Sequence, residues 1–154
     1  MFSLIITIIS IALVAALAVA SVYYGGSAFS QGSAKASAST LVAQAQQIAG
    51  ANTLYANDNG GTFAQNVDDL VPEYLSAAPI PSSKVAVGSW EIGANNVITL
   101  DLVDGATEVA GQIDAQAGVT GTRPATVPTT GGSQFGVTAA VEGEVTDLGF
   151  FYKG

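Results

Sequence analysis

Carboxylates are the side chains of this sequence with the clearest potential for chemistry. Asp101, Asp104 and Glu108 lie close together in the chain, and carboxylate oxygens are the hard ligands that Ca²⁺ prefers. They lack a matching ligand spacing, so we interpret them mainly as part of an acidic surface in contact with water. Asp68, Asp69 and Glu73 lie near a turn, where they are expected to cap a short helix.

Other catalytic chemistry has little support in the sequence. The chain contains no histidine and no cysteine, so it lacks the commonest general base, the thiolate nucleophile and two common metal ligands. No glycine-rich phosphate loop follows a strand and opens a helix. We therefore expect no enzymatic activity and no cofactor. The formal net charge of −8 also makes a nucleic-acid partner unexpected, because an acidic surface repels phosphates.

A second set of candidate residues carries small side chains near the N-terminus. They recur at helical spacing as the hydroxyl residues Ser3, Thr7 and Ser10, and as the alanines Ala12, Ala16 and Ala20. Both patterns are typical of helices that pack closely in an apolar medium, where hydroxyls bond carbonyls of a neighbouring helix. We interpret them as candidate helix-packing residues.

The element that carries them is an uncharged apolar helix over residues 1–24. No Asp, Glu, Lys or Arg occurs before Lys35. A helix of ~20 residues crosses the ~30 Å hydrocarbon core of a bilayer. Three interpretations stay open: a removed leader, a membrane anchor, or a helix that packs against copies of itself. Ala18–Ala20 fits a cleavage site, but no basic residue precedes the apolar run, which favours the other two.

Glycines follow the apolar run. Gly25, Gly26 and Gly32 each cost a helix ~1 kcal/mol relative to alanine, so we predict a helix break over residues 25–33.

An amphipathic helix is predicted next, over about residues 34–57. Leu41, Ala45, Ile48 and Tyr55 share one face, and amide side chains such as Asn52 occupy much of the remainder. The sequence "NDNGG" then ends the helix, with Asn59 or Gly60 in a left-handed conformation.

The C-terminal part of the chain alternates with period two, which is typical of strands. After a linker over about residues 58–83, "KVAVGSWEI" and "VITLDLV" predict a hairpin turned by "GANN". Ile98, Leu100 and Leu102 are expected to face the helix, and Trp90 to lie in the core. We expect "EVAGQID" to be a third strand and "FGVTAAVEGEVTDLGFFYKG" to add one or two more.

The predicted fold class is therefore α+β: a long N-terminal apolar helix with a glycine break, continuing into an amphipathic helix packed on an antiparallel β-sheet over about residues 84–154. Residues 34–154 would form one globular head domain.

A polar loop is predicted from Ala117 to Gln134. It is rich in Thr, Pro and Gly, with threonines at Thr120, Thr122, Thr126, Thr129 and Thr130. An unmodified surface loop is the favoured interpretation, and O-glycosylation is the alternative.

The order of these segments resembles that of type IV pilins and the related pseudopilins. The resemblance rests on the uncharged first helix, on "LVAQAQQIAGANTLYANDNGG" and on "DDLVPEYLSAAP" before a β-rich tail. It implies a pilin-like fold and a structural subunit of an extracellular filament on the cell surface. Such a subunit waits in the inner membrane, and its apolar helices then pack together as a helical homopolymer.

The resemblance implies partners and processing as well. A prepilin peptidase would remove a basic leader, Met1 would be the first mature residue and carry N-terminal methylation, and assembly machinery would extrude the subunit. The sequence departs from the family at Ile5, where the family usually has glutamate. Acceptors for the N-terminal amine would then come from Ser3, Thr7 or carbonyls freed near Gly25. Alternatives are a minor pilin or pseudopilin of a secretion system, and a membrane-anchored or secreted binding module.

Overall fold

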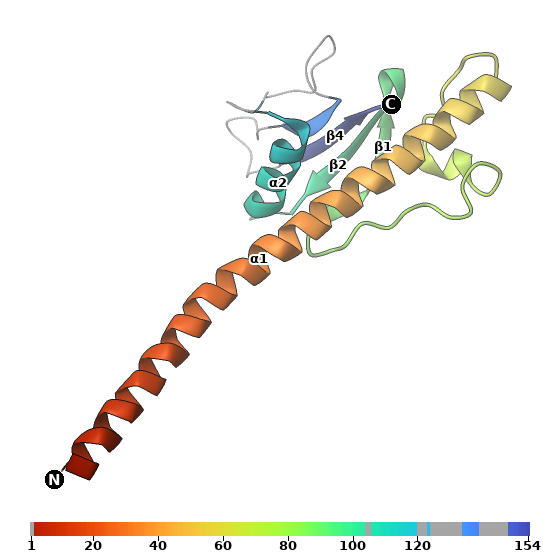
Figure 1. Cartoon of the computed structure of the whole chain (residues 1–154). Coiled ribbons are helices and arrows are strands. Elements are labelled where there is room, and N and C mark those ends of the chain that lie inside the picture. The colour runs from red at the N-terminus through yellow and green to blue at the C-terminus, as the bar shows by residue number, and fades with distance from the viewer. Residues whose placement is uncertain (1, 104–105, 120–122, 124–133, 139–147) are drawn as a thin grey trace. The chain divides into compact units, whose positions relative to one another are not determined.

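The fold is α+β, with a long N-terminal helix and an antiparallel sheet (Figure 1). The computed structural model describes residues 2–103, 106–119, 123, 134–138 and 148–154. The chain divides into two compact units, Met1–Ser33 and Ala34–Gly154, and each is described by itself below. The elements are α1 (Phe2–Asp58), η1 (Val67–Leu70), β1 (Ala86–Gly93), η2 (Ala94–Asn96), β2 (Val97–Leu102), α2 (Thr107–Ala117), β3 (Phe135–Thr138) and β4 (Gly149–Lys153).

Helix α1 is continuous through the glycines that predict a break. Residues 25–33 are helical, so the predicted break at Gly25, Gly26 and Gly32 is wrong. Extending a formed helix by one residue adds a hydrogen bond, and the alanines and serines around the glycines tolerate this conformation. The glycine cost of ~1 kcal/mol each lowers the local stability of the helix without ending it.

The C-terminal part of α1, in the second unit, has the predicted apolar face. Leu41, Ala45 and Ile48 are buried, which confirms the pattern read from the sequence. The other buried residues of this face include Ala34, Ala38, Val42, Ala49, Ala51 and Ala56. Many of these side chains are alanines, so the helix backbone can lie close to its packing partners. The helix ends as predicted, with Gly60 at φ +67° and the Gly61 amide donating to the Ala56 carbonyl over 2.7 Å.

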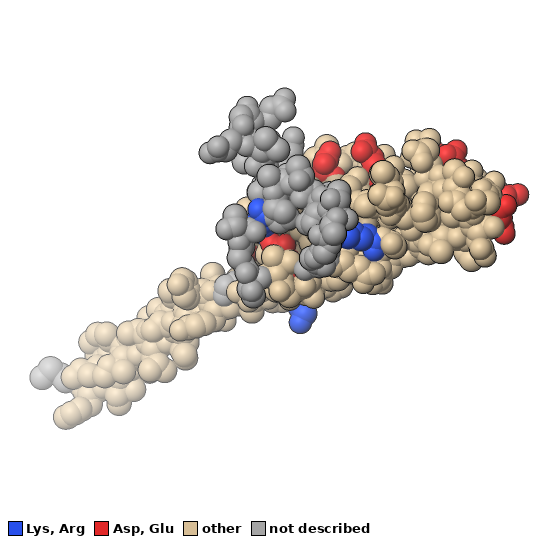
Figure 2. Space-filling view, turned by 90° about the horizontal axis from the view of Figure 1, so that it is seen from above, with Lys and Arg blue, Asp and Glu red and all other residues tan. Residues whose placement is uncertain are grey.

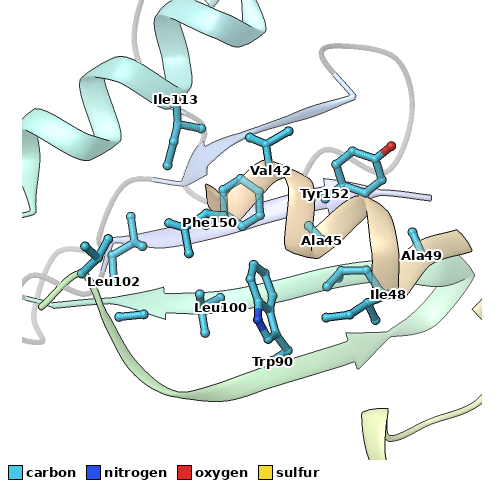
Figure 3. Packing of buried hydrophobic residues seen from close by; sticks show 14 of the residues in the cluster. Val42, Ala45, Ile48, Ala49, Trp90, Leu100, Leu102, Ile113, Phe150 and Tyr152 are labelled. Atoms are coloured by element: carbon cyan, nitrogen blue, oxygen red, sulfur yellow. The ribbon is translucent and has the colours of Figure 1, made fainter. Parts of the chain in front are cut away.

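The described strands pair in the order β1-β2-β4-β3, and every neighbouring pair is antiparallel. Leu100 pairs with Phe150 and Ile98 with Tyr152, so these four side chains share one face of the sheet. All four are buried, as the sequence predicts for Ile98 and Leu100. Figure 3 shows Val42, Ala45, Ile48 and Ala49 of α1 at this face.

Trp90 of β1 lies in the core, as predicted. Its ring meets that of Phe150 edge to face, with centroids 5.8 Å apart (Figure 3). Such aromatic pairs contribute ~0.5–1.5 kcal/mol beyond the apolar area that they bury.

The outer strand β1 contains an irregularity. Its register against β2 shifts between Val87 and Glu91, and Gly88 in this stretch has φ +79°. A positive φ of this kind suits glycine, and the shift is a β-bulge that bends the strand.

The segment "EVAGQID" is a helix, so the predicted third strand is wrong. It lies within α2, whose residues Val109, Ala110 and Ile113 are buried. Val109, Gly111 and Ile113 alternate as a strand would, but Val109 and Ile113 are also four residues apart and share a helix face. Gly118 at φ +70° ends the helix. The third and fourth described strands are β3 and β4, within the C-terminal segment predicted to supply them.

A buried pair of asparagines joins α1 to the hairpin between β1 and β2. The amide of Asn52 donates to Asn96 Oδ1 over 2.9 Å and accepts from the Ala64 N–H over 2.8 Å. Asn96 Nδ2 in turn lies 3.2 Å from the Ala49 carbonyl oxygen. Both asparagines are at most 2% exposed. The expectation that Asn52 lies on the polar side of its helix is therefore wrong, because its amide groups are paired inside the head.

Candidate functional site

The candidate site is the apolar segment of α1, residues 2–24. Every large apolar side chain in it is exposed, with exposed fractions from 52% at Ile5 to 85% at Phe2. The first unit carries no charged side chain, and Figure 2 shows it without blue or red atoms. By length and composition α1 is able to cross a membrane, and its most apolar stretch has no buried residue. A helix this apolar is stable only where lipid or protein covers it.

Two hydroxyl groups of this segment, those of Thr7 and Ser10, are hydrogen-bonded within the helix. Thr7 Oγ1 donates to the Ser3 carbonyl over 2.7 Å, and Ser10 Oγ donates to the Ile6 carbonyl over 2.8 Å. The sequence predicts that such hydroxyls bond a neighbouring helix, whereas here their protons serve their own backbone. Each oxygen keeps lone pairs that can accept a bond. The segment therefore places no unpaired Thr7 or Ser10 proton in an apolar medium.

The two sets of candidate packing residues lie on different sides of the helix. Ser3 and Ala12 are nine residues apart, as are Thr7 and Ala16, and at 3.6 residues per turn this separation is ~180° around the axis. Ala12, Ala16 and Ala20 therefore form one stripe, while the hydroxyl residues face the opposite side. Both sets are exposed. The geometry offers two separate faces for contact with neighbouring helices.

Two tyrosines mark the end of the apolar segment. Tyr23 and Tyr24 are exposed, and their rings meet edge to face with centroids 5.7 Å apart. Tyrosine is enriched where a membrane-spanning segment reaches the headgroups, because its ring is apolar and its hydroxyl polar. The next residues, Gly25 and Gly26, have open space where a Cβ would lie, so no close contact in the described chain requires glycine there.

Residue 5 is an exposed isoleucine, at 52%. The first carboxylate in the sequence is Asp58, so no acidic side chain of the apolar segment can pair with an N-terminal amine. Because the helix does not unwind near Gly25, no carbonyls are released there, and that proposed set of acceptors is withdrawn. Met1 itself lies outside the described residues, as does its expected methylation.

The acidic residues of the head do not form a metal site in the described part of the chain. Asp101 is exposed on β2 and Glu108 lies in the first turn of α2, while Asp104 is outside the described residues. Within the described ranges, no three potential ligands gather to hold a metal ion. Asp68 and Asp69 lie in the first turn of η1, but no side chain caps that short helix.

Tyr74, which contacts the C-terminal end of α1, has a shifted pKa. Tyr74 donates its hydroxyl to Asp58 Oδ2 over 3.0 Å. This hydrogen bond raises the pKa of Tyr74 above its ordinary value of 10.0, and desolvation and the negative charge of Asp58 raise it further. The contact joins the end of α1 to the segment after η1.

The threonine-rich loop cannot be compared with its prediction. Residues 120–122 and 124–133, which include all five of its threonines, lie outside the described residues. Its one described cation is Arg123, whose Nε lies 2.6 Å from Asp114 Oδ2 of α2.

Comparison of the chain with protein-family models, with curated proteins and with solved structures gives no match. The long apolar helix and antiparallel sheet are compatible with a pilin-like fold.

The sequence pattern indicates the apolar segment and its small residues, but not the buried hydrogen bonds inside the head. The buried pair Asn52–Asn96 joins residues 44 positions apart, and no local pattern indicates it. The Asn95–Asn96 pair was a usable signal for the turn, since asparagine tolerates the positive φ that both residues adopt there.

Proposed function

We propose that this protein is a structural subunit of an extracellular type IV pilus-like filament. Its N-terminal apolar helices pack against one another in the filament, and the subunit is held in the inner membrane before assembly. One observation carries the proposal: an uncharged segment of membrane-spanning length, with all its large apolar side chains exposed, is continuous with a helix of a folded head.

Energetics favour a segment that exchanges one apolar environment for another. Full burial of an apolar side chain contributes ~1.5–3 kcal/mol, so ~20 of them contribute tens of kcal/mol before entropic costs. A bilayer supplies most of this burial, and packing against other helices replaces lipid contacts with protein contacts. Because the two environments are similar in free energy, moving the subunit out of the membrane requires work. This agrees with the assembly machinery that the resemblance to pilins implies.

The local chemistry of the helix supports the same proposal. Thr7 and Ser10 donate within the helix, and Ala12, Ala16 and Ala20 leave one side without bulk. Small residues let helix backbones approach closely where the hydrophobic effect does not drive association. The two faces on opposite sides of α1 suit a helix with neighbours on more than one side.

A second candidate is a membrane-anchored or secreted binding module. The Tyr23–Tyr24 pair favours it, because interfacial tyrosines position a single spanning helix without any contact between copies. A minor pilin or a secretion-system pseudopilin is a variant of the first proposal. Prepilin peptidase processing and methylation of Met1 rest on the resemblance alone.

Electron microscopy of material sheared from producing cells tests the proposal. We expect thin fibres, and mass spectrometry of their subunit should recover residues 2–24. A subunit that begins beyond Ala20, or one that stays monomeric and monodisperse without detergent, would contradict it.

A deletion separates the two candidates. Removing residues 2–26 should abolish fibres if the segment assembles the filament. If it is only a tether, the shortened protein should lose membrane attachment while the full-length protein never forms fibres.

A further inference from the structure

The C-terminal end of α1 carries a reactive pair of neighbouring residues. Asn59 follows the last residue of the helix, and Gly60 comes next. No other asparagine of the chain precedes a glycine. The Asn59 side-chain carbonyl carbon and the Gly60 nitrogen are joined through covalent bonds that can close into a five-membered ring, and glycine hinders this closure least because it has no Cβ. Both residues are exposed and belong to the second unit.

The Gly60 N–H is not used by the cap of the helix. The Asn59 N–H donates to the Tyr55 carbonyl over 2.9 Å and the Gly61 N–H donates to the Ala56 carbonyl over 2.7 Å. Among the described residues, no acceptor takes the Gly60 N–H. A Cβ built at Gly60 or Gly61 meets no atom within 4 Å. The Gly60 nitrogen can therefore lose its proton to water or hydroxide without breaking a structural hydrogen bond.

Two hydrogen bonds of Asn59 bear on the same reaction. Its backbone carbonyl, which belongs to the same peptide group as the Gly60 nitrogen, accepts from the Thr62 N–H over 3.3 Å. Such a bond favours the anion that forms when the peptide group loses its proton. The Asn59 side-chain amide donates to the Tyr55 carbonyl over 2.9 Å. This bond is exposed, so water can replace it when the side chain turns toward Gly60.

We propose that Asn59 is a site of spontaneous deamidation in the folded head. The deprotonated Gly60 nitrogen attacks Cγ of Asn59, a C–N bond forms, and the Cγ–Nδ2 bond breaks. The departing nitrogen takes a proton from water and leaves as ammonia. Water then opens the cyclic imide at either carbonyl carbon, which gives aspartate or isoaspartate at position 59. The net reaction converts an amide and water into a carboxylic acid and ammonia, so no oxidant or reductant takes part.

The modification changes the end of α1 in two ways. The new carboxylate lies at the negative end of the helix dipole, beside Asp58, and the last turn contains no basic residue to offset it. Isoaspartate also lengthens the main chain by one carbon, between the partners of the Gly61–Ala56 hydrogen bond. Both changes loosen the last turn of α1 as the protein ages. The inference is independent of the filament proposal, since a tethered head carries the same site.

Peptide mapping by mass spectrometry tests the proposal on the full-length protein in detergent, incubated at mildly alkaline pH. Fragmentation assigns each amide-to-acid mass gain to one residue. Conversion of Asn59 should be at least about tenfold faster than that of Asn57, which is also exposed but precedes Asp58. A sample unfolded in urea shows that the assay detects the product. Asn59 that stays intact in the folded protein while it converts in urea, or equal rates at Asn59 and Asn57, would overturn the proposal.

Two variants test the role of each partner. Gly60→Ala places a Cβ beside the attacking nitrogen and should slow the reaction about tenfold or more. Because alanine is strained at the φ of +67° found there, Asn59→Gln provides an independent test. It keeps an amide at position 59 but requires a six-membered ring, so its mass gain should be far slower. A wild-type rate in either variant would overturn the mechanism.

The effect on the helix is measured with the product itself. In Asn59→Asp, hydrogen exchange at the last turn of α1 should be about two- to fivefold faster than in the wild type, because the added charge opposes the helix dipole. Asn66→Asp adds the same charge at an exposed position outside α1 and should leave this exchange unchanged. Equal exchange in Asn59→Asp and the wild type would overturn the proposed loosening of the helix end.

Discussion

Asn96 combines a turn conformation with a buried side chain in the hairpin of the head. Its backbone has φ +60°, which asparagine tolerates, and its side chain joins a buried hydrogen-bond network with Asn52 and Ala49. The neighbouring Asn95 has a similar φ of +58° but is exposed. The two positions therefore separate the role of the turn conformation from that of the buried amide.

Glycine substitution at each position tests this difference. Asn96→Gly keeps the positive φ but leaves the Asn52 amide unpaired, so it should lower the free energy of unfolding by ~2–4 kcal/mol. Asn95→Gly loses no buried bond and should change it by less than ~1 kcal/mol. Denaturant unfolding followed by Trp90 fluorescence measures both. Equal effects would show that the amide network does not stabilise the hairpin.

The hydrogen bond from Tyr74 to Asp58 should make the stability of the folded chain depend on pH. Donation to Asp58 favours the protonated phenol, so the contact stabilises the folded chain at pH values below the unfolded pKa of about 10. That stabilisation is lost as the pH rises through the raised pKa of the folded state.

Neutralising the acceptor should lower this pKa. In Asp58→Asn, the pKa of Tyr74 should move down toward its ordinary value, because the charge that opposes a phenolate is removed. NMR titration of the Tyr74 ring measures the shift. An unchanged pKa in the variant would mean that Asp58 does not control the ionisation of Tyr74.

Single residues were predicted best where burial follows a short period. Ile98, Leu100 and Trp90 are buried as their strand patterns indicate. Asn52 was misassigned because its amide was counted with the polar side, although it follows Ile48 by four residues and Ala45 by seven and therefore shares the buried face of the helix.

At the scale of elements, α1 shows how tolerant a long helix is of glycine. Gly25, Gly26 and Gly32 have no atom within 4 Å of a built Cβ, so alanine fits at each position. Local propensity predicts a break, while the hydrogen bonds on both sides keep the helix formed.

Alanine at two of these positions should stabilise that part of the helix. In Gly25→Ala/Gly26→Ala, the amides near residues 23–29 should exchange more slowly, corresponding to ~0.5–1 kcal/mol for each glycine. Hydrogen exchange of the detergent-solubilised protein measures this. Unchanged exchange would indicate that the segment is not helical in solution. If the fibres form, a loss of fibres in this variant would show that assembly requires the helix to unwind there.

The other elements were predictable in proportion to the clarity of their period. The hairpin of β1 and β2 combines alternation with a typical turn, and it was found. Helix α2 was taken for a strand because Val109, Gly111 and Ile113 alternate as in a strand, while only Val109 and Ile113 also fit the period of a helix. Only its burial against the core, a tertiary effect, separates the two.

At the scale of the whole molecule, the division into an uncharged helix and an acidic head follows from composition. Charged residues begin at Lys35, and the second compact unit begins at Ala34. Composition locates this division but does not say what covers the apolar segment, because lipid and other helices are similar environments for such side chains.

The alanine stripe gives an assembly test with a close control. Ala16→Leu adds bulk to the stripe, keeps the segment apolar and should lower fibre yield at least about tenfold, a change of ~1.4 kcal/mol in association. Ala15→Leu makes the same change ~100° around the helix and should leave the yield nearly unchanged.

Fibre yield by electron microscopy and membrane insertion by fractionation are measured for both variants. Insertion should be normal in each. Equal fibre yields would show that the stripe is not a packing face.

The bulge in β1 affects whether the edge strands of separate molecules can pair and aggregate. An unpaired outer strand can recruit the strand of another molecule, and regular, flat edges do so most readily. Here the register shift between Val87 and Glu91 and the left-handed Gly88 bend the exposed border. At the opposite border of the described strands, β3 is only four residues long. The described edges of the sheet are therefore poor templates for cross-β growth, which would let the heads stay separately folded if the proposed packing of apolar segments brings many copies together.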